Sequence, residues 1–315
     1  MKVRRQCAFS GIVLTALAAW PSMLASPPNT TGVPAQSVQM VVTVQPVHQG
    51  ESARNGLQPG DLTVIEGNRS VPVERLRRLA GDLADMQLFV LLDDSTRSAS
   101  LSLHLPELKV FLNSLPSTTQ VAVGYLRNGT VALPEAFTAD HQKAADALRL
   151  PLAIPGVNGS PYFGLSDLVK HWPSEGPAGR RAVLMLTDGV DRYYDTEVTD
   201  DPYVDAAVQD ALKSGVMVYS IYLRGAGLYG RNDWVTNFAQ SRLSEVSQET
   251  GGYAYFEAFT DPVTITPFLN DFLDRLGNQY EVTFESLNGH GMQPVKLRTA
   301  LPGLKIESPS RILVQ

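Results

Sequence analysis

The middle of the chain alternates continuous apolar runs with segments of helical spacing. The apolar runs lie at residues 88–92, 182–186 and 216–223. Such runs are typical of strands that are buried on both faces of a parallel sheet. Helical spacing of apolar residues occurs between and after them, at 103–115, 141–150, 162–172, 203–214, 234–250 and 265–276. This order predicts an α/β domain at residues 85–278 with a doubly wound, mainly parallel sheet.

The regions on either side of this domain show a two-residue period instead. Loose alternation at 38–44 and a hairpin signal at 62–73 predict strands in the N-terminal part. Alternation predicts further strands near the C-terminus, at 280–284, 295–298 and 311–314. We expect the strands of residues 36–80 and 279–315 to pair in one small β module that holds the α/β domain as an insert.

The first 35 residues have the pattern of an export signal and a linker. Three basic residues precede a short apolar run and a small residue near position 25, which predicts a signal peptide at 1–25, with an uncleaved anchor as the alternative. Residues 26–35 have the composition of a linker. No later segment approaches the roughly 18 apolar residues of a membrane helix, so we expect no transmembrane span in the mature chain. The expected location is periplasmic or secreted.

Composition and net charge exclude several further classes of function and of site. The chain has 315 residues, of which 43% are hydrophobic and 18% are charged, which is ordinary for a globular protein. Its formal net charge of −6 argues against nucleic acid as a partner. Cys7 is the single cysteine, which excludes an intramolecular disulfide and a thiolate metal cluster.

Candidate chemistry gathers where two of the predicted buried strands end. Asp93 follows the run at 88–92 and Asp188 follows the run at 182–186. In open parallel sheets, sites form beyond the carboxyl ends of the strands. Together with the hydroxyls of Ser95 and Ser160, these carboxylates offer the oxygen ligands that a hard divalent cation prefers. The alternative is structural, because Asp also caps helices and occupies turns.

These motifs resemble the von Willebrand factor type A family over about residues 85–278, and most closely a bacterial secreted subgroup with β segments on both sides. In that family the first strand ends in Asp-x-Ser-x-Ser, a later loop gives a Thr, and the central strand ends in Thr-Asp-Gly. The resemblance implies a metal-ion-dependent adhesion site in which Asp93, Ser95 and Asp188 hold Mg²⁺ or Mn²⁺ and Ser160 replaces the Thr. It also implies that Gly251-Gly252 leads into the last strand of the sheet.

One departure from the family motif bears on the metal. The third hydroxyl position is occupied by Arg97, and a register that begins one residue later, at Asp94, restores the hydroxyls. We prefer the register that begins at Asp93, because Asp93 directly follows the apolar run. If Arg97 points into the site, its charge opposes a divalent ion and replaces it between Asp93 and Asp188. If Arg97 points outward, a weaker metal site remains.

We therefore expect an exported interaction or adhesion module and not an enzyme. The resemblance implies that a protein partner binds at the top of the sheet and offers an Asp or Glu carboxylate, either to the metal or to Arg97. The neighbouring Asp94, Asp191, Tyr193 and Tyr194 are further candidates for partner contacts, since aromatic residues are enriched at interfaces. A metal-free structural envelope protein is the main alternative.

Two enzyme-like interpretations are weaker. Residues 225–230 fit the letters of a dinucleotide fingerprint, but they follow a late strand and not the first one. We therefore expect no nucleotide. A hydrolase lacks support as well, because no Gly-x-Ser-x-Gly elbow occurs in the sequence.

Overall fold

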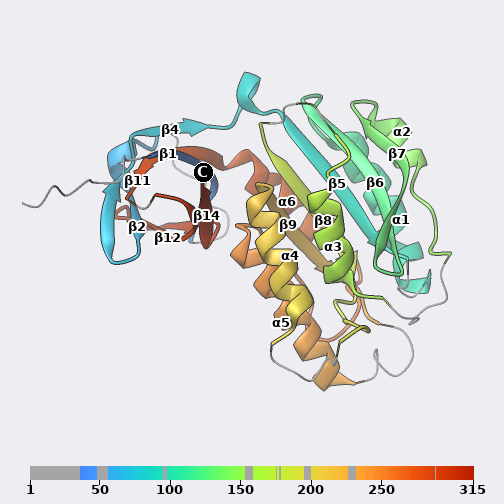
Figure 1. Cartoon of the computed structure of the whole chain (residues 1–315). Helices are drawn as coiled ribbons and strands as arrows, with labels where there is room; N and C mark the ends of the chain where they lie inside the picture. Colours follow the sequence, from blue (N-terminus) through green and yellow to red (C-terminus); the bar gives the residue numbers. More distant parts are fainter. Residues whose placement is uncertain are drawn as a thin grey trace, which may run out of the picture. The chain divides into compact units, whose positions relative to one another are not determined.

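The three apolar runs form neighbouring parallel strands in the computed structural model (Figure 1). They are β5 (Met86–Asp93), β8 (Arg181–Thr187) and β9 (Val216–Tyr222). Three further strands complete the sheet: β6 (Thr119–Arg127), β10 (Ala254–Tyr255) and, antiparallel at one edge, β7 (Thr130–Thr138). The strand order is β10-β9-β8-β5-β6-β7. The predicted mainly parallel α/β fold is confirmed.

The part of the chain that the structure describes excludes the N-terminus and several loops. The described residues are 36–47, 56–94, 98–152, 159–174, 176, 179–194, 200–225, 232–287 and 289–315, with only the backbone for 98 and 99. The signal peptide and linker expected at 1–25 and 26–35 lie outside them. None of the helices within these ranges has the length and apolar character that a membrane span requires.

In the part of the chain that the structure describes, three helices pack on each face of the sheet. The helices on one face are α1 (Ser98–Ser114), α2 (His141–Asp146) and α6 (Thr266–Gly277). Those on the other face are α3 (Pro161–Lys170), α4 (Pro202–Lys213) and α5 (Asp233–Glu249). The two-residue period of β5 divides its side chains between the two cores, with Leu88 and Val90 on the first face and Phe89 and Leu91 on the second.

The flanking segments build a β module from two four-stranded sheets. The first has the order β13 (Leu304–Glu307), β1 (Gln36–Pro46), β11 (Gln279–Ser286), β4 (Arg75–Arg78). The second has the order β14 (Arg311–Val314), β12 (Gly291–Thr299), β2 (Leu62–Glu66), β3 (Arg69–Pro72). Val42, Val64 and Val282 are fully buried in their common core. The predicted pairing of N-terminal with C-terminal strands is confirmed.

The chain passes between the β module and the α/β part at two neighbouring crossings, near residues 79–84 and 276–279. The side chain of buried Arg180 forms hydrogen bonds to both crossings. Leu79 at the first crossing donates its backbone N–H to the carbonyl of Gln279 at the second (2.9 Å). The guanidinium of Arg180 donates to the carbonyl of Ala84 (2.8 Å), the carbonyl of Leu276 (2.9 Å) and the side-chain oxygen of Gln279 (2.7 Å). Burial lowers the pKa of Arg180.

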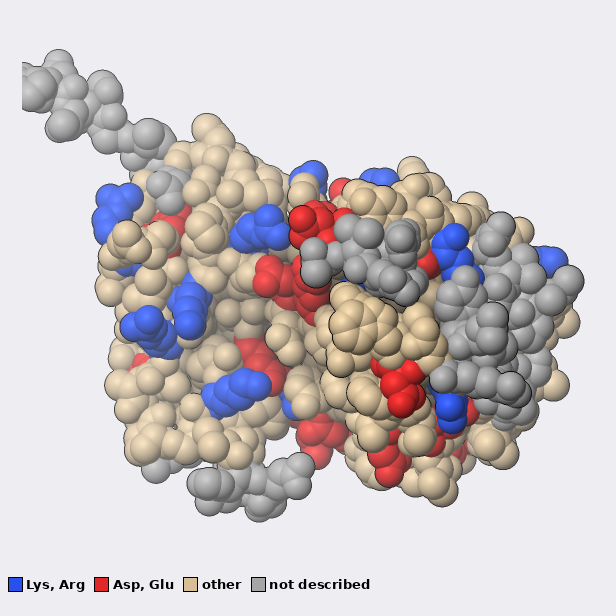
Figure 2. Space-filling model, turned by 90° about the horizontal axis from the view of Figure 1, so that it is seen from below, with Lys and Arg blue, Asp and Glu red and all other residues tan. Residues whose placement is uncertain are grey.

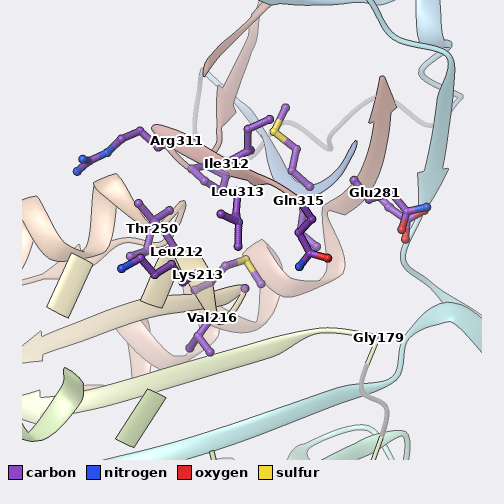
Figure 3. Close-up of a pocket in the computed structure, with 16 residues that line it drawn as sticks. Gly179, Leu212, Lys213, Val216, Thr250, Glu281, Arg311, Ile312, Leu313 and Gln315 are labelled. Atoms are coloured by element: carbon purple, nitrogen blue, oxygen red, sulfur yellow. The ribbon is translucent and has the colours of Figure 1, made fainter. Parts of the chain in front are cut away.

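A cavity of about 290 Å³ lies near these crossings (Figure 3). Its lining includes Val216 at the start of β9, Lys213 at the end of α4, and Ile312 and Leu313 of β14. The cavity is therefore at the amino ends of the parallel strands, opposite the edge where the sequence places the candidate site.

Candidate functional site

The predicted carboxylates lie at adjacent strand ends. In the parallel pairing of β5 with β8, Leu92 lies opposite Leu186, which sets Asp93 beside Thr187 and brings Asp188 directly after it. The hydroxyl of Thr187 donates to Asp93 Oδ2 (2.7 Å). Asp93 and Asp188 are both buried, at 2% and 0% exposure. We call this edge of the sheet, with the loops after β5 and β8 and the start of α3, the rim.

Asp188 is paired with an arginine four residues further along the chain. Arg192 Nη1 lies 3.3 Å from Asp188 Oδ1, and Nη2 donates to Oδ2. Asp188 Oδ1 also accepts the backbone N–H of Val190 (3.0 Å). Both side chains are buried, at 3% and 0% exposure. Each oxygen of this carboxylate is therefore engaged inside the protein.

Gly225, shortly after β9, lies against the carboxylate of Asp188. A Cβ atom built at Gly225 would lie 2.8 Å from Asp188 Oδ2, which is closer than real Cβ contacts. Glycine at this position thus allows the close approach of the backbone to the carboxylate. The remainder of the fingerprint-like stretch, 226–230, lies outside the described residues.

Ser160 reaches the same edge but bonds to a different carboxylate. As the N-cap of α3 it accepts the backbone N–H of Phe163 (3.1 Å), and it donates to Asp191 Oδ2 (2.5 Å). The backbone N–H of Arg192 donates to the carbonyl of Gly159 (2.9 Å), which holds the two loops together. Ser95, the remaining predicted metal ligand, lies outside the described residues.

Two residues expected to contact a partner are buried instead. Asp191 is 1% exposed, and its Oδ1 accepts the backbone N–H groups of Tyr193 (2.7 Å) and Tyr194 (3.0 Å). Burial raises the pKa of Asp191, although its hydrogen bonds act in the opposite direction. Asp94 is fully buried. Each carboxylate thus folds its own loop, and a direct contact of either one with a partner stays a prediction.

The bonds of Asp94 also bear on the register of the first motif. Asp94 Oδ1 accepts from the guanidinium of Arg149 (2.8 Å) and from the backbone N–H of Leu152 (2.9 Å). Its own N–H donates to Leu126 at the end of β6 (3.0 Å). Asp94 thus bonds on the side of β6, whereas Asp93 bonds toward β8. This favours the register that begins at Asp93.

The two tyrosines after Asp191 are on the surface. Tyr193 is 41% exposed and Tyr194 is 37% exposed. The ring of Tyr193 packs edge-on against Phe163 (6.2 Å between centroids) and Tyr203 (6.3 Å), and Phe163 is itself 44% exposed. We call Phe163, Tyr193, Tyr194 and Tyr203 the rim aromatic cluster.

A second buried ion pair lies behind this cluster. Asp201 caps α4 by accepting the backbone N–H of Tyr203 (2.9 Å), and its Oδ2 lies 3.1 Å from Arg242 Nη1. Both residues are less than 5% exposed. Sequence reasoning missed the roles of Arg192 and Arg242. Only Arg192 carried a local signal, its four-residue spacing from Asp188, whereas Arg242 comes from a distant helix.

The described donors do not fit a divalent ion. Asp188 is bound to a guanidinium, and the Ser160 hydroxyl points its proton at Asp191. At ~4 Å and an effective dielectric constant of ~20, two unit charges interact by about 4 kcal/mol, so a divalent ion beside Arg192 would meet about twice that repulsion. Among the described residues, no group of three or more His, Cys, Asp or Glu side chains could hold a metal ion.

The expected replacement of the cation by an arginine takes a different form. The guanidinium at Asp188 comes from Arg192, which follows the central strand, and not from the first motif. Arg97 lies outside the described residues. The two roles that we expected for Arg97, a cation in the site and a contact for the partner, stay predictions.

The last strand of the sheet agrees with the family pattern as well. Gly251 has a φ of +83°, and a Cβ at Gly252 would lie 1.9 Å from the carbonyl oxygen of Val218 in β9. The glycine pair is thus required where the chain enters β10 beside β9. First-strand Asp93, the later Ser160 and central-strand Asp188 lie at one edge of the parallel sheet. In these features the α/β part resembles a von Willebrand factor type A domain.

Comparison with known proteins adds structural neighbours only. No protein-family model matches the sequence, and no curated protein matches it. An aerotolerance-related membrane protein from Bacteroides fragilis is 14% identical at a TM-score of 0.42, over 61% of this chain and 98% of that one. BatB from Bacteroides thetaiotaomicron is 12% identical at a TM-score of 0.41, over 61% and 98%.

A third similar structure is proximal thread matrix protein 1 from the mussel byssus, which was solved with a zinc-occupied MIDAS motif. It is 16% identical at a TM-score of 0.44, over 63% of this chain and 46% of that one. The type A-like domain described here thus matches less than half of the mussel protein.

Proposed function

We propose that this chain is an exported, non-catalytic interaction or adhesion module that binds a protein partner through the rim of its type A-like domain. The observation that carries the proposal is the rim aromatic cluster, which a buried polar network holds at the surface. The proposed location is the periplasm or the outside of the cell, as the sequence of residues 1–25 predicts.

The network fixes the backbone from which the aromatic side chains project. Asp191 binds the N–H groups of Tyr193 and Tyr194, while Ser160 joins Asp191 to the start of α3, where Phe163 lies. Tyrosine offers a large apolar ring with a polar tip and is enriched at interfaces. Since Tyr193 and Tyr194 are already held by these hydrogen bonds, a partner that binds them has a smaller entropic cost to overcome.

Charge favours a neutral or basic partner surface at the rim. Residues 81–278 contain 25 Asp and Glu but 14 Lys and Arg, whereas the segments 36–80 and 279–315 together contain 7 and 9. On the face shown in Figure 2, Lys and Arg gather mainly over the β module. An acidic domain attracts positive partner surfaces and repels negative ones. Recognition of a partner Asp or Glu stays a prediction that depends on Arg97, because Arg192 is buried and paired.

The metal-free form of the module agrees best with the donors at Asp188. The same ion pair also supports the second candidate, a structural envelope protein in which the rim has no binding role. The two candidates differ in what the exposed tyrosines do, and this difference can be measured.

The test is affinity capture from an extract of the source cells. Wild-type protein is compared with the double variant Tyr193→Ala/Tyr194→Ala and with a control, Val110→Ala, which removes a side chain that is 72% exposed on α1. We expect the wild type and the control to capture the same protein, with and without a chelator, and the double variant to lose it. Equal capture by a folded double variant would contradict the proposed rim.

A further inference from the structure

The ion pair between Asp188 and Arg192 lies at the edge of the sheet where the resemblance implies a divalent cation. Arg192 spans both carboxylate oxygens of Asp188, and Nη1 also donates to the carbonyl of Val190 (3.2 Å). The side chain of Arg192 is 3% exposed, so water does not screen the pair. Gly225 packs against the same carboxylate from the loop after β9.

The local backbone directs Arg192 back onto the carboxylate. Gly189 has a φ of +66°, a conformation that favours glycine, and it turns the chain immediately after Asp188. The N–H of Arg192 is fixed on the carbonyl of Gly159 (2.9 Å). The guanidinium is therefore positioned by the backbone of the rim itself. Its position does not require a bound ion.

Other oxygen donors lie at the same edge of the sheet. Asp93 accepts from Thr187 at the end of the neighbouring strand, and Ser160 retains an oxygen lone pair beyond its bonds to Phe163 and Asp191. Carboxylate and hydroxyl oxygens are the donors that a divalent ion takes together with waters, once the positive charge at Asp188 is removed.

We propose that Arg192 is a permanent internal cation of the rim: the native protein takes no divalent metal there, and removal of the guanidinium uncovers a latent site for Mg²⁺ or Mn²⁺. The assignment does not depend on the identity of any partner. It can therefore fail or succeed separately from the proposed function.

The experiment is a calorimetric titration with Mn²⁺ alone. We expect no binding by the wild type at millimolar concentration and at least about tenfold tighter binding by Arg192→Ser, with a rise in melting temperature on adding Mn²⁺. The double variant Asp188→Asn/Arg192→Ser should lose that binding. Arg149→Ser is the matched control, because Arg149 also pairs with a buried aspartate at a strand end, Asp94, and its removal should create no Mn²⁺ site.

The other possible results of this experiment also decide for or against the proposal. Mn²⁺ binding by the wild type that disappears in Asp188→Asn would show that the native site takes metal. Failure of folded Arg192→Ser to bind Mn²⁺ would show that the oxygens form no latent site. If Arg192→Ser does not fold alone, refolding is repeated with millimolar Mn²⁺: recovery supports the latent site, and failure in both conditions overturns it.

Discussion

Arg192 at the carboxyl end of the central sheet and Arg180 at its amino end are both buried, but their guanidinium groups contact different kinds of oxygen. Arg192 faces a carboxylate of the rim. Arg180 donates to two backbone carbonyls and an amide oxygen where the chain crosses between its two parts. The first arginine neutralises a buried charge, and the second satisfies neutral acceptors. The same residue type therefore supports the rim at one end of the sheet and the crossings between the two parts at the other.

The largest effect is expected from breaking the rim pair on one side. Removing one partner of a buried ion pair leaves an uncompensated charge, which typically costs about 3–5 kcal/mol. We expect Arg192→Leu to lower the free energy of unfolding by about this amount, and Asp188→Asn/Arg192→Leu to recover a large part of it. Urea denaturation measures both.

A surface ion pair provides the matched control for that cycle. Lys143 and Glu135 are 2.7 Å apart with side chains that are 56% and 27% exposed. Lys143→Ala should leave the denaturation midpoint nearly unchanged. If it costs as much as Arg192→Leu, burial is not the cause of the difference.

An intermediate loss of stability is expected from removing Arg180, which bonds to both crossings between the β module and the α/β part. Arg180→Met leaves the acceptors on Ala84, Leu276 and Gln279 without their donor, and each buried unsatisfied group costs about 1–3 kcal/mol before relaxation. With partial entry of water, we expect a loss of about 2–4 kcal/mol in unfolding free energy. The neighbouring Arg181→Met removes a guanidinium that stacks on Trp172 (5.7 Å) and should cost about 1 kcal/mol or less. Equal losses would contradict a special role for Arg180.

The smallest effect concerns a carboxylate that is held by backbone N–H groups and by side-chain donors. Glu107 on α1 accepts the N–H groups of Ile265 (3.0 Å) and Thr266 (2.8 Å) at the start of α6 and a bond from His104 (2.9 Å). Burial alone would raise the pKa of Glu107, but its bonds to His104, Thr264 and Thr266 outweigh burial and lower the pKa from 4.5 to about 2.

A lowered pKa of an acid means that the ionised form stabilises the folded state. This stability is present above pH 4.5 and is lost as the pH falls toward 2. We expect about 2–3 kcal/mol to disappear across this window, and Glu107→Gln to remove most of that pH dependence. Asp274→Asn on the exposed side of α6 is the control. An unchanged pH profile in Glu107→Gln would contradict the assignment.

The fold could be predicted well from the sequence, because the pattern of apolar residues in a strand depends directly on which of its faces are buried. The runs within β5 and β8 are apolar at every position, and the run within β9 is interrupted only by Ser220, which distinguishes strands covered on both faces from the alternating strands of the β module. The expected pairing of N-terminal with C-terminal strands is observed, for example between β1 and β11.

The site was predicted only in part. Strand ends placed Asp93 and Asp188 correctly at one edge, since topology alone determines that edge. The direction of the Arg192 side chain depends on the turn at Gly189, which no periodicity shows. The burial of Asp94 and Asp191 depends on donors from Arg149 and Ser160, more than 30 residues away in each case, and such contacts leave no local pattern.

The two crossings between the parts have a mechanical consequence. The described chain begins in β1 and ends in β14, and both strands belong to the β module. Tension applied between the two ends of the described chain therefore acts on the β module first. The type A-like domain, which is inserted between strands of that module, does not carry this load directly. Tension applied at the rim would instead enter the central sheet and reach the β module through the two crossings and through contacts such as the ion pair between Arg275 of α6 and Glu307 of β13.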